Sequence, residues 1–380
     1  MGEEFPLDDS IVYLNHAAVS PWPQRTCEAV KRFARENTRF GAARYPDWQK
    51  TERKLRAQLA WLINAPSADD ISLLKNTSEG LSTVAYGLDW QEGDNVITFK
   101  QEFPSNRVVW ESLHRLGVET RLVDIANSDC PEQSLIDSCD DRTRLISSSS
   151  VQYATGLRVD LETIGAHCRQ NDILFCVDAI QSLGAIPFDV QRVQADFVMA
   201  DGHKWMLGPE GIALFYCRKE LRQQLRLNQF GWHMLANAGD FGRSDWVPAD
   251  SGARFECGSP NMLGIHALSA SLDLIAELGI DTVYAQLMEK TALLIKLIEG
   301  SPARFALLSD KAAARRSGIV LFEILGVDAQ AAYRQLMNAG IICACRAGGI
   351  RLSPHFYTPS IAIEKAWQQI VYVAKNTDKK

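Results

Sequence analysis

The chain contains 380 residues, of which 46% are hydrophobic and 23% are charged, as in an ordinary globular protein. With 46 acidic against 40 basic residues, the formal net charge of −6 gives no indication of nucleic-acid binding. There is no run of 18 apolar residues and the start MGEEFPLDDS is acidic, so we expect neither a membrane span nor a secretory signal. Nine cysteines at irregular spacings, without a CxxC pair, argue against a disulfide framework or structural zinc and favour a reducing cytoplasm.

Apolar, β-branched runs alternate with helical patterns over the first two thirds of the chain. The expected strands are 95–99, 119–123, 144–148, 174–177, 197–200 and 212–216, and helical patterns between them include 107–116 and 161–170. Such alternation is typical of βαβ units and a mostly parallel sheet. Ligands of these sheets bind at the carboxyl ends of the strands.

The pattern changes after the segment Gly258-Ser-Pro-Asn261. Long helical patterns at 263–279 and 282–299 are followed by a strand at 318–323, a helix at 329–339 and a strand at 350–353. We therefore expect a compact α+β domain at the carboxyl end. No GxGxxG follows an early strand, so a nucleotide-binding dehydrogenase is set aside.

The segment 197–211 places His203 and Lys204 in a turn directly after an expected strand. A loop rich in glycine and proline follows and holds this turn in place. A lysine between an apolar strand and a rigid turn is partly desolvated, which lowers its pKa and leaves a free amine able to attack an aldehyde. The alternative is a solvated lysine on the surface.

An apolar strand ends at Asp178, 26 residues before Lys204, and Gln181 follows three residues later. A buried carboxylate at a strand end needs a donor or a cation, and a pyridinium N–H is such a partner. Gln181 is placed to donate to the phenolic oxygen of the same ring. The alternative for Asp178 is a cap of the next helix.

Three further positions carry weaker signals. Thr77 and Ser78 open a helical pattern after a short apolar run, which suits either an anion site or an ordinary N-cap. Phe103 follows an expected strand and either stacks on a planar cofactor or belongs to the core. Arg351 leaves a late strand and either clamps a substrate carboxylate or forms a surface ion pair.

In this order, the motifs resemble the fold-type I pyridoxal-phosphate enzymes of the class V aminotransferase family, in the branch of cysteine desulfurases and isopenicillin N epimerase-like proteins. The resemblance covers nearly the whole chain: Tyr13-Leu-Asn-His-Ala-Ala, Asp178-x-x-Gln181, Gly202-His-Lys-Trp, Phe255-Glu-Cys-Gly-Ser-Pro-Asn and Arg351-Leu-Ser-Pro-His-Phe-Tyr. It implies an α/β, transferase-like fold whose large domain, 16–260, holds a mostly parallel seven-stranded sheet flanked by helices. Residues 1–15 and 261–380 would form a smaller α+β domain.

The resemblance also implies pyridoxal 5'-phosphate as cofactor, bound as a Schiff base to Lys204, which then moves protons at the substrate α-carbon. The other cofactor-binding residues that it implies are Asp178 at the pyridine nitrogen, Gln181 at the phenolic oxygen, Thr77, Ser78 and His203 at the phosphate, Phe103 stacked on the ring, and Gln152 near substrate and cofactor. Ser259 would reach the phosphate of a partner subunit, which implies a homodimer with shared active sites. Arg351 would bind the substrate carboxylate, with Asn15 and His16 in a bordering segment.

The sequence departs from the desulfurases in three ways. Cys343 and Cys345 lie in a short segment before Arg351, so we expect Cys345 on or at the end of a strand, which disfavours a persulfide-forming enzyme of the usual kind. Phe103 replaces a histidine found in many relatives and cannot relay protons. Asp201 would repel a phosphate dianion and is expected to point elsewhere.

We therefore predict a cytoplasmic, homodimeric enzyme that acts on an amino acid and contacts neither nucleic acid nor membrane. An aminotransferase is the first choice; a carbon–sulfur lyase or desulfurase-like enzyme, or an epimerase, is the alternative. All three share α-proton removal by Lys204. A non-catalytic cofactor-binding protein is the alternative from another class, and the full set of Lys204, Asp178, Gln181 and Arg351 argues against it.

Overall fold

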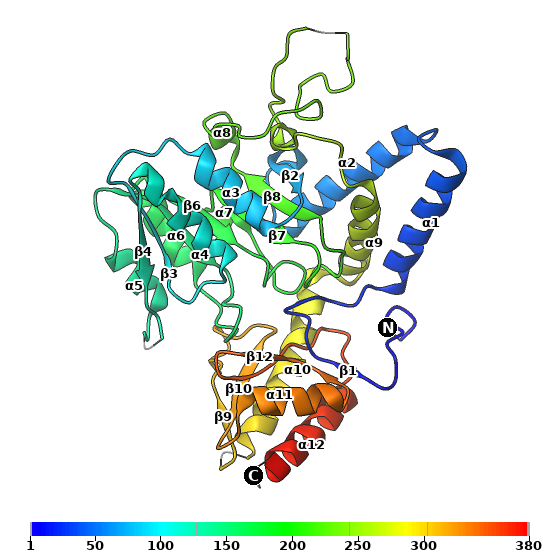
Figure 1. The fold of residues 1–380 in the computed structure, drawn as a ribbon, viewed down its shortest axis with the longest axis vertical. Coiled ribbons are helices and arrows are strands. Elements are labelled where there is room, and N and C mark those ends of the chain that lie inside the picture. Colours follow the sequence, from blue (N-terminus) through cyan, green and yellow to red (C-terminus); the bar gives the residue numbers. More distant parts are fainter. Residues whose placement is uncertain (1, 127, 243, 302, 378–380) are drawn as a thin grey trace.

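The computed structural model describes residues 2–126, 128–242, 244–301 and 303–377. A large unit built on one sheet lies above a smaller unit in Figure 1. The strands of the large sheet are β2 (Ile71–Leu74), β3 (Asn95–Phe99), β4 (Glu119–Val123), β5 (Thr143–Ser149), β6 (Leu174–Asp178), β7 (Phe197–Asp201) and β8 (Ala213–Cys217). All six strands predicted from the sequence are present, each with its ends shifted by at most one residue.

The strand order across this sheet is β2-β8-β7-β6-β5-β3-β4. Strands β3 to β7 run parallel to one another, whereas β8 is antiparallel to both β7 and β2. This confirms the predicted α/β class with a mostly parallel, seven-stranded sheet. The carboxyl ends of β5, β6 and β7 therefore lie side by side at one edge, where such folds bind their ligands.

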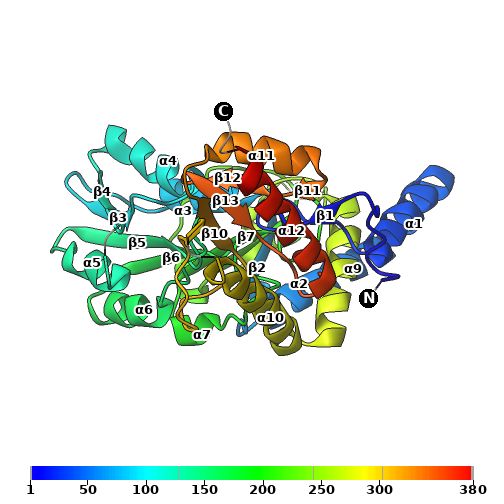
Figure 2. The same ribbon diagram turned by 90° about the horizontal axis from the view of Figure 1, so that it is seen from below.

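Helices cover both faces of the sheet, as Figure 2 shows. On one face α3 (Thr77–Gly87) and α4 (Ser105–Glu111) share a core with Cys176 of β6. On the other face α6 (Leu161–Gln170) and α7 (Val190–Val193) share a core with Phe175 and Val177. Successive residues of β6 thus enter different cores, which explains why the strand is an unbroken apolar run.

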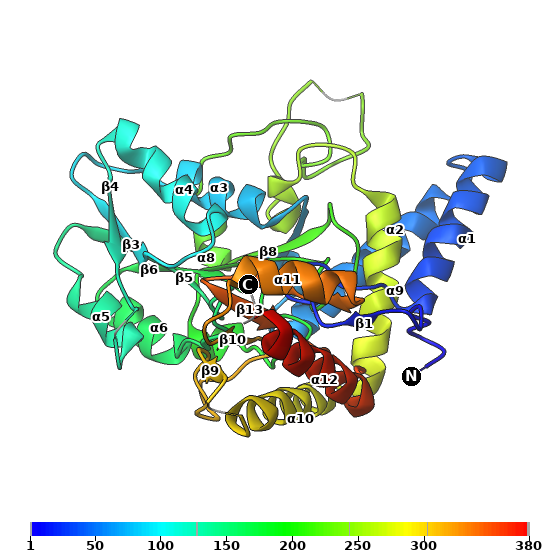
Figure 3. The same cartoon turned by 60° about the horizontal axis from the view of Figure 1, so that its bottom comes forward.

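Three long helices pack at one side of the large unit: α1 (Gln24–Phe40), α2 (Tyr45–Leu62) and α9 (Met262–Leu278), as Figure 3 shows. Helices α1 and α2 were not predicted from the sequence. Apolar residues of α9, including Leu268 and Leu272, belong to the main core of the large unit. The domain boundary after residue 260 stays a prediction, and this packing groups α9 with the preceding sheet.

The smaller unit holds an antiparallel sheet of order β12-β13-β10-β9, which confirms the predicted α+β organisation. Its strands are β9 (Phe305–Leu307), β10 (Val320–Ile324), β12 (Ala344–Arg346) and β13 (Gly349–Leu352), and its helices are α10 (Ile280–Glu299), α11 (Ala329–Asn338) and α12 (Ser360–Thr377). The amino-terminal β1 (Val12–Tyr13) pairs with β11 (Ile341–Ile342), and Leu14 enters the core of this unit.

Short helices complete the chain: α5 (Pro131–Asp137), α8 (Lys219–Arg222), and the 3-10 turns η1 (Ala68–Asp70), η2 (Ser112–Leu116) and η3 (Gly252–Phe255). Within the described ranges, no single helix is long and apolar enough to cross a membrane. Among the described helices, the pair α9 and α10 together reaches the required length and hydropathy, and it bends by 84° at the break between them.

Candidate functional site

A cavity of about 360 Å³ opens at the carboxyl ends of β5, β6 and β7, whose last residues Ser149, Asp178 and Asp201 line it. The smaller unit closes its other side with Arg346 and Arg351. Eight residues predicted from the sequence meet in this one cavity: Thr77, Ser78, Phe103, Asp178, Gln181, His203, Lys204 and Arg351.

Lys204 lies in the turn that follows β7, and its Nζ is 5.7 Å from the centroid of the Phe103 ring. Burial lowers the pKa of Lys204 to about 8, and the opposing charge of Asp178 only partly offsets this effect. A lysine of this pKa is partly neutral near neutral pH and can act as a nucleophile or a base. Lys204 is thus a desolvated lysine inside a cavity and not a surface residue.

Asp178 ends β6 and is only 2% exposed. Its Oδ1 accepts a hydrogen bond from the Ile180 backbone N–H at 3.0 Å. Burial raises the pKa of Asp178 to about 6. In the part of the chain that the structure describes, no arginine, lysine or histidine forms an ion pair with this carboxyl, so a cationic ligand would stabilise its charged form.

A second buried carboxyl, Glu102, stands beside Asp178. It accepts hydrogen bonds from the Ser149 backbone N–H, at 2.7 Å, and from the Ser149 hydroxyl. Ser149 is the direct neighbour of Asp178 across β5 and β6. Burial raises the pKa of Glu102 to about 7, and the charge of Asp178 adds to this effect. Two buried carboxyls with raised pKa values favour a state in which one of them is protonated.

The amino terminus of α3 forms another wall of the cavity. Thr77 Oγ1 accepts a hydrogen bond from the Asp201 backbone N–H at 3.2 Å, and Ser78 Oγ lies 2.9 Å from Ser105 Oγ. His203 Nδ1 is buried without a partner among the described residues. Hydroxyls at a helix amino terminus together with an unpartnered imidazole nitrogen make a site for an anion.

The prediction that Asp201 points away from this site is wrong, because Asp201 lines the cavity. Burial raises the pKa of its carboxyl to about 6. A protonated carboxyl carries no charge and donates a hydrogen bond, so Asp201 can stand near an anion without repelling it.

Gln181 ties the turn after β6 to two neighbouring segments. Its Oε1 accepts a hydrogen bond from Trp205 Nε1 at 2.9 Å, and its Nε2 donates to the Ala17 carbonyl at 3.1 Å. Gly184 has a φ of +96°, and a Cβ there would lie 2.4 Å from the Trp205 carbonyl oxygen. Glycine at this position therefore lets the turn pack closely against the residue that follows Lys204.

Arg351 lies in β13 and is 2% exposed. Its Nη1 donates to the Tyr153 carbonyl at 2.6 Å and its Nη2 to Asn15 Oδ1 at 3.3 Å, while Nε is buried without a partner among the described residues. Burial lowers the pKa of Arg351 to about 10, and the charge of Arg346 adds to this effect. A buried guanidinium held by neutral acceptors needs an anion as partner.

Four predicted residues do not line the cavity. Asn15 orients Arg351, and the fully buried His16 bonds to the Ser353 carbonyl at 2.8 Å and to Tyr357 Oη at 2.6 Å. The Gln152 side chain bonds to backbone groups and to the Thr155 hydroxyl. Ser259 is exposed. The roles predicted for these four side chains remain predictions.

Several polar or charged lining residues received no role from the sequence, among them Ser105, Tyr153, Glu210 and Arg346. The Tyr153 ring stands edge-on to Phe103 at 5.3 Å between centroids. The sequence carried a signal for two of these residues, because Ser105 stands at a helix start and Tyr153 stands just after a strand. None of the nine cysteines lines the cavity. Cys345 lies in β12, as expected, and burial raises its pKa.

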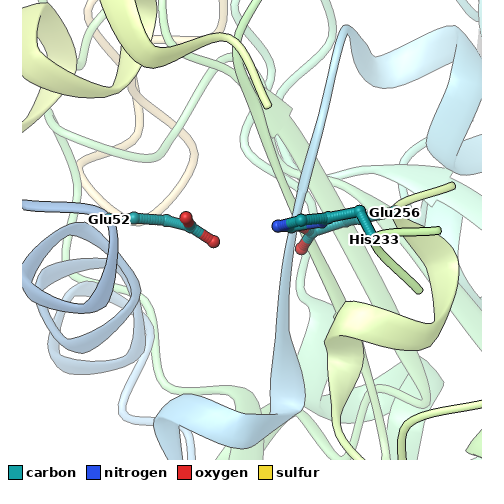
Figure 4. A group of neighbouring side chains, drawn as sticks. All are labelled: Glu52, His233 and Glu256. Atoms are coloured by element: carbon teal, nitrogen blue, oxygen red, sulfur yellow. The ribbon is translucent and has the colours of Figure 1, made fainter. Parts of the chain in front are cut away.

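A polar cluster outside the cavity brings Glu52 of α2 near His233 and Glu256 (Figure 4). Its geometry suits a metal ion, but the Arg56 guanidinium already pairs with both carboxylates at 2.6 Å. Glu256 also accepts the Leu73 backbone N–H at 2.7 Å. The guanidinium therefore takes the place that a cation would occupy between the two carboxylates, and the cluster fastens α2 and the His233 loop to the edge strand β2.

A family model described as Aminotransferase class-V matches residues 12–358. The chain belongs to this family. A probable cysteine desulfurase of Methanothermobacter thermautotrophicus is 33% identical over 293 residues, which cover 76% of this chain and 72% of that protein. A cysteine desulfurase of Salmonella newport is 30% identical over 296 residues, with coverages of 74% and 72%. These relatives favour carbon–sulfur chemistry, the predicted alternative, over transamination.

Solved structures confirm the fold of this class V family member. An apo cysteine desulfurase from Thermococcus onnurineus NA1 matches with a TM-score of 0.88 at 23% identity, over 98% of this chain and 97% of that one. The cystine C-S lyase C-DES in complex with its product, cysteine persulfide, matches with a TM-score of 0.88 at 24% identity, with coverages of 97% and 99%.

Pyridoxal phosphate, the predicted cofactor, is the cofactor of this family, and a C-DES variant with glycine covalently linked to it matches with a TM-score of 0.89 at 23% identity, over 98% of this chain and 99% of that one. The residues of the cavity fit this group. Asp178 lacks a cationic partner among the described residues, Lys204 is desolvated, and His203 Nδ1 is buried without a partner. These are the groups that a pyridine nitrogen, an aldehyde and a phosphate require.

Proposed function

We propose that this enzyme cleaves the Cβ–S bond of a sulfur-containing amino acid. Similarity to cysteine desulfurases supports this substrate class. The observation that carries the proposal is the single cavity in which a desolvated Lys204 meets a buried Arg351. Transamination, the first choice from the sequence, shares the same early steps and is tested alongside.

Arg351 binds the substrate α-carboxylate. Its guanidinium is fixed by Tyr153 and Asn15, so little conformational entropy is lost when an anion binds. In a buried site, a charge-assisted, two-point contact between guanidinium and carboxylate is strong and directional. This contact fixes the orientation of Cα in the cavity.

Lys204 removes the Cα proton. Its pKa, lowered to about 8, leaves part of the Nζ population neutral near neutral pH, which suits a general base. When bound, pyridoxal phosphate supplies an electron sink for the pair left on Cα. Asp178 would pair with the ring nitrogen, Thr77 and Ser78 would hold the phosphate with His203, and Phe103 would lie against the ring.

The sulfur then leaves with the electron pair of the Cβ–S bond and is protonated. The carbon product, 2-aminoacrylate, reacts with water to give pyruvate and ammonium, so no oxidant or reductant is needed. Because no cysteine side chain lines the cavity, no enzyme thiol is placed to take the sulfur. Sulfur therefore departs on a small molecule, which distinguishes this reaction from transfer to a protein persulfide.

The test is product analysis of the holoenzyme with L-cysteine, L-cystine, L-alanine and L-glutamate. We expect pyruvate and ammonium in equal amounts with released sulfur species from the sulfur amino acids, and none with K204A. Alanine with sulfur left on the protein would instead indicate a desulfurase. Amino transfer to an added keto acid, without sulfur release, would restore the aminotransferase assignment.

We further propose that the enzyme is a cytoplasmic homodimer. Ser259 is exposed and lies outside the cavity of its own chain, which leaves it available to a partner's site. The loop after α8 projects from the large unit in Figure 1 and carries five exposed apolar side chains: Phe230, Trp232, Phe241, Trp246 and Val247. Such a patch is typical of a protein–protein interface. The free cysteines support a reducing compartment.

A further inference from the structure

Arg346 is a second arginine of the cavity, and the reaction proposed above gives it no task. It lines the cavity together with Arg351, and its Nη1 donates to the carbonyl of the adjacent Cys345, at 2.8 Å. In the described ranges of the chain, it forms no ion pair. The Arg346 side chain is exposed at the cavity, and its charge lowers the pKa of both Lys204 and Arg351.

A tight hairpin fixes the place of Arg346. It ends β12 opposite Gly349, and the two turn residues Ala347 and Gly348 have φ values of +44° and +77°. Two successive residues with positive φ form a short, well-defined turn that matches the twist of the two strands. Arg351 lies on the other strand of the same hairpin, opposite Ala344. One rigid element therefore presents both guanidinium groups.

Neither arginine of the cavity forms an ion pair with a carboxylate among the described residues. Of the three acidic residues that line the cavity, Asp178 serves the ring nitrogen in the proposed site, Asp201 lies beside Thr77 at the phosphate end, and Glu210 follows the turn that carries Lys204. The α-carboxylate of a substrate neutralises Arg351 alone. Two like charges facing one cavity repel each other unless an anion lies near each of them, so a ligand with two anionic groups suits this geometry better than one.

We propose that Arg346 binds a second anionic group on the substrate side chain, so that the cavity selects acidic amino acids over neutral ones. In terms of the proposed function, the substrate is a sulfur amino acid that bears a second carboxylate or a sulfur oxyanion beyond Cβ. Only this choice of sulfur substrate rests on the proposed function; the preference for two anionic groups needs only the cavity.

Titration calorimetry of the holoenzyme with glutarate and with butyrate tests the subsite without any turnover. We expect glutarate to bind at least about tenfold more tightly than butyrate, as for one charge-assisted contact. R346Q lacks the second cation, so glutarate and butyrate should bind about equally. The ratio of their two dissociation constants should then approach one. R334Q is the matched control, because Arg334 is exposed on α11 and lies outside the cavity, and it should keep the wild-type ratio.

Three outcomes would overturn the subsite. An equal loss for glutarate and butyrate in R346Q would place Arg346 at the α-carboxylate beside Arg351. A wild-type ratio near one, or an R346Q ratio equal to that of wild type, would leave Arg346 with no ligand.

The value of kcat/KM for S-carboxymethylcysteine, cysteine sulfinate and cysteine then separates the two kinds of anion. We expect the wild-type enzyme to prefer one of the two acidic substrates and R346Q to reduce that preference about tenfold. The preferred substrate then shows whether the second anionic group is a carboxylate or a sulfur oxyanion. Selective glutarate binding without sulfur release from any substrate would refute the proposed function and leave the subsite standing. Sulfur release without selective glutarate binding would support the proposed function and refute the subsite.

Discussion

Arg351 Nη1 donates to the Tyr153 backbone carbonyl at 2.6 Å, which joins β13 of the smaller unit to the loop after β5 of the large one. The two residues are 198 positions apart in the chain. The substrate-carboxylate position is thereby fixed relative to the strand ends that carry Asp178 and Lys204.

Replacing Arg351 by lysine keeps a charge but removes the forked guanidinium. We expect KM for the amino acid to rise about 100-fold, with a smaller fall in kcat, because the lost contact is made with the bound substrate as well as in the transition state. Steady-state kinetics would measure both constants, and the thermal unfolding temperature would control for folding. An unchanged KM in a folded R351K would contradict the assignment.

The lowered pKa of Lys204, about 8, predicts how the apo enzyme takes up its cofactor. Below this pKa the amine is protonated and cannot attack the aldehyde, so covalent uptake should be slow. The rate should rise with pH and level off above about 8. Stopped-flow absorbance after mixing the apo enzyme with pyridoxal phosphate measures this. A rate that rises only near pH 10 would mean that Lys204 is an ordinary solvated lysine.

Replacing Asp178 by asparagine keeps the shape of the side chain but removes its charge. We expect kcat to fall by about 100-fold or more, since the carboxylate no longer favours a protonated ring nitrogen. The absorption spectrum of the bound cofactor should show that binding survives, which separates the effect from cofactor loss. If turnover matched that of wild type, Asp178 would not be the partner of the ring nitrogen.

Replacing Arg56 by alanine should destabilise the protein. It would leave the Glu52 and Glu256 carboxylates, which are 11% and 5% exposed, without their cation. We expect a loss of about 3 kcal/mol in the free energy of unfolding, measured by urea denaturation.

Lys50 is the matched control for this effect. Its pair with Asp47 on the same helix is exposed, so K50A should change the free energy of unfolding by less than about 1 kcal/mol. Equal effects of R56A and K50A would show that burial does not decide the strength of these pairs.

The exposed apolar loop after α8 is the proposed dimer interface, so a charge placed there should weaken the dimer. Phe241 is 81% exposed, and replacing it by aspartate should shift the protein from dimer to monomer in light scattering. The affinity for the cofactor should also fall, because Ser259 would no longer reach the site of a partner subunit. V108D is the control: Val108, 54% exposed, lies on α4 away from this loop. Dissociation by both variants, or a monomeric wild type, would contradict the interface.

The sequence by itself determined the class of the fold and the central chemical residues. Strands such as β6 and β7 are buried on both faces, so they appear as apolar runs, and the residue that ends each run marks the ligand edge of the sheet. Lys204 and Asp178 follow from this local rule and from the family resemblance. The resemblance of these motifs to the class V aminotransferase family also predicted pyridoxal phosphate as the cofactor.

Only the tertiary structure decided which other side chains reach the cavity. Ser105, Tyr153 and Arg346 line it because segments from distant parts of the chain pack together, and no periodicity in the sequence encodes such contacts. The same reason explains why Asp201 lines the cavity against expectation, and why α9 joins the core of the large unit. Burial of each charge, which sets the pKa of Lys204 and Asp178, likewise depends on the assembled neighbours and not on the local sequence.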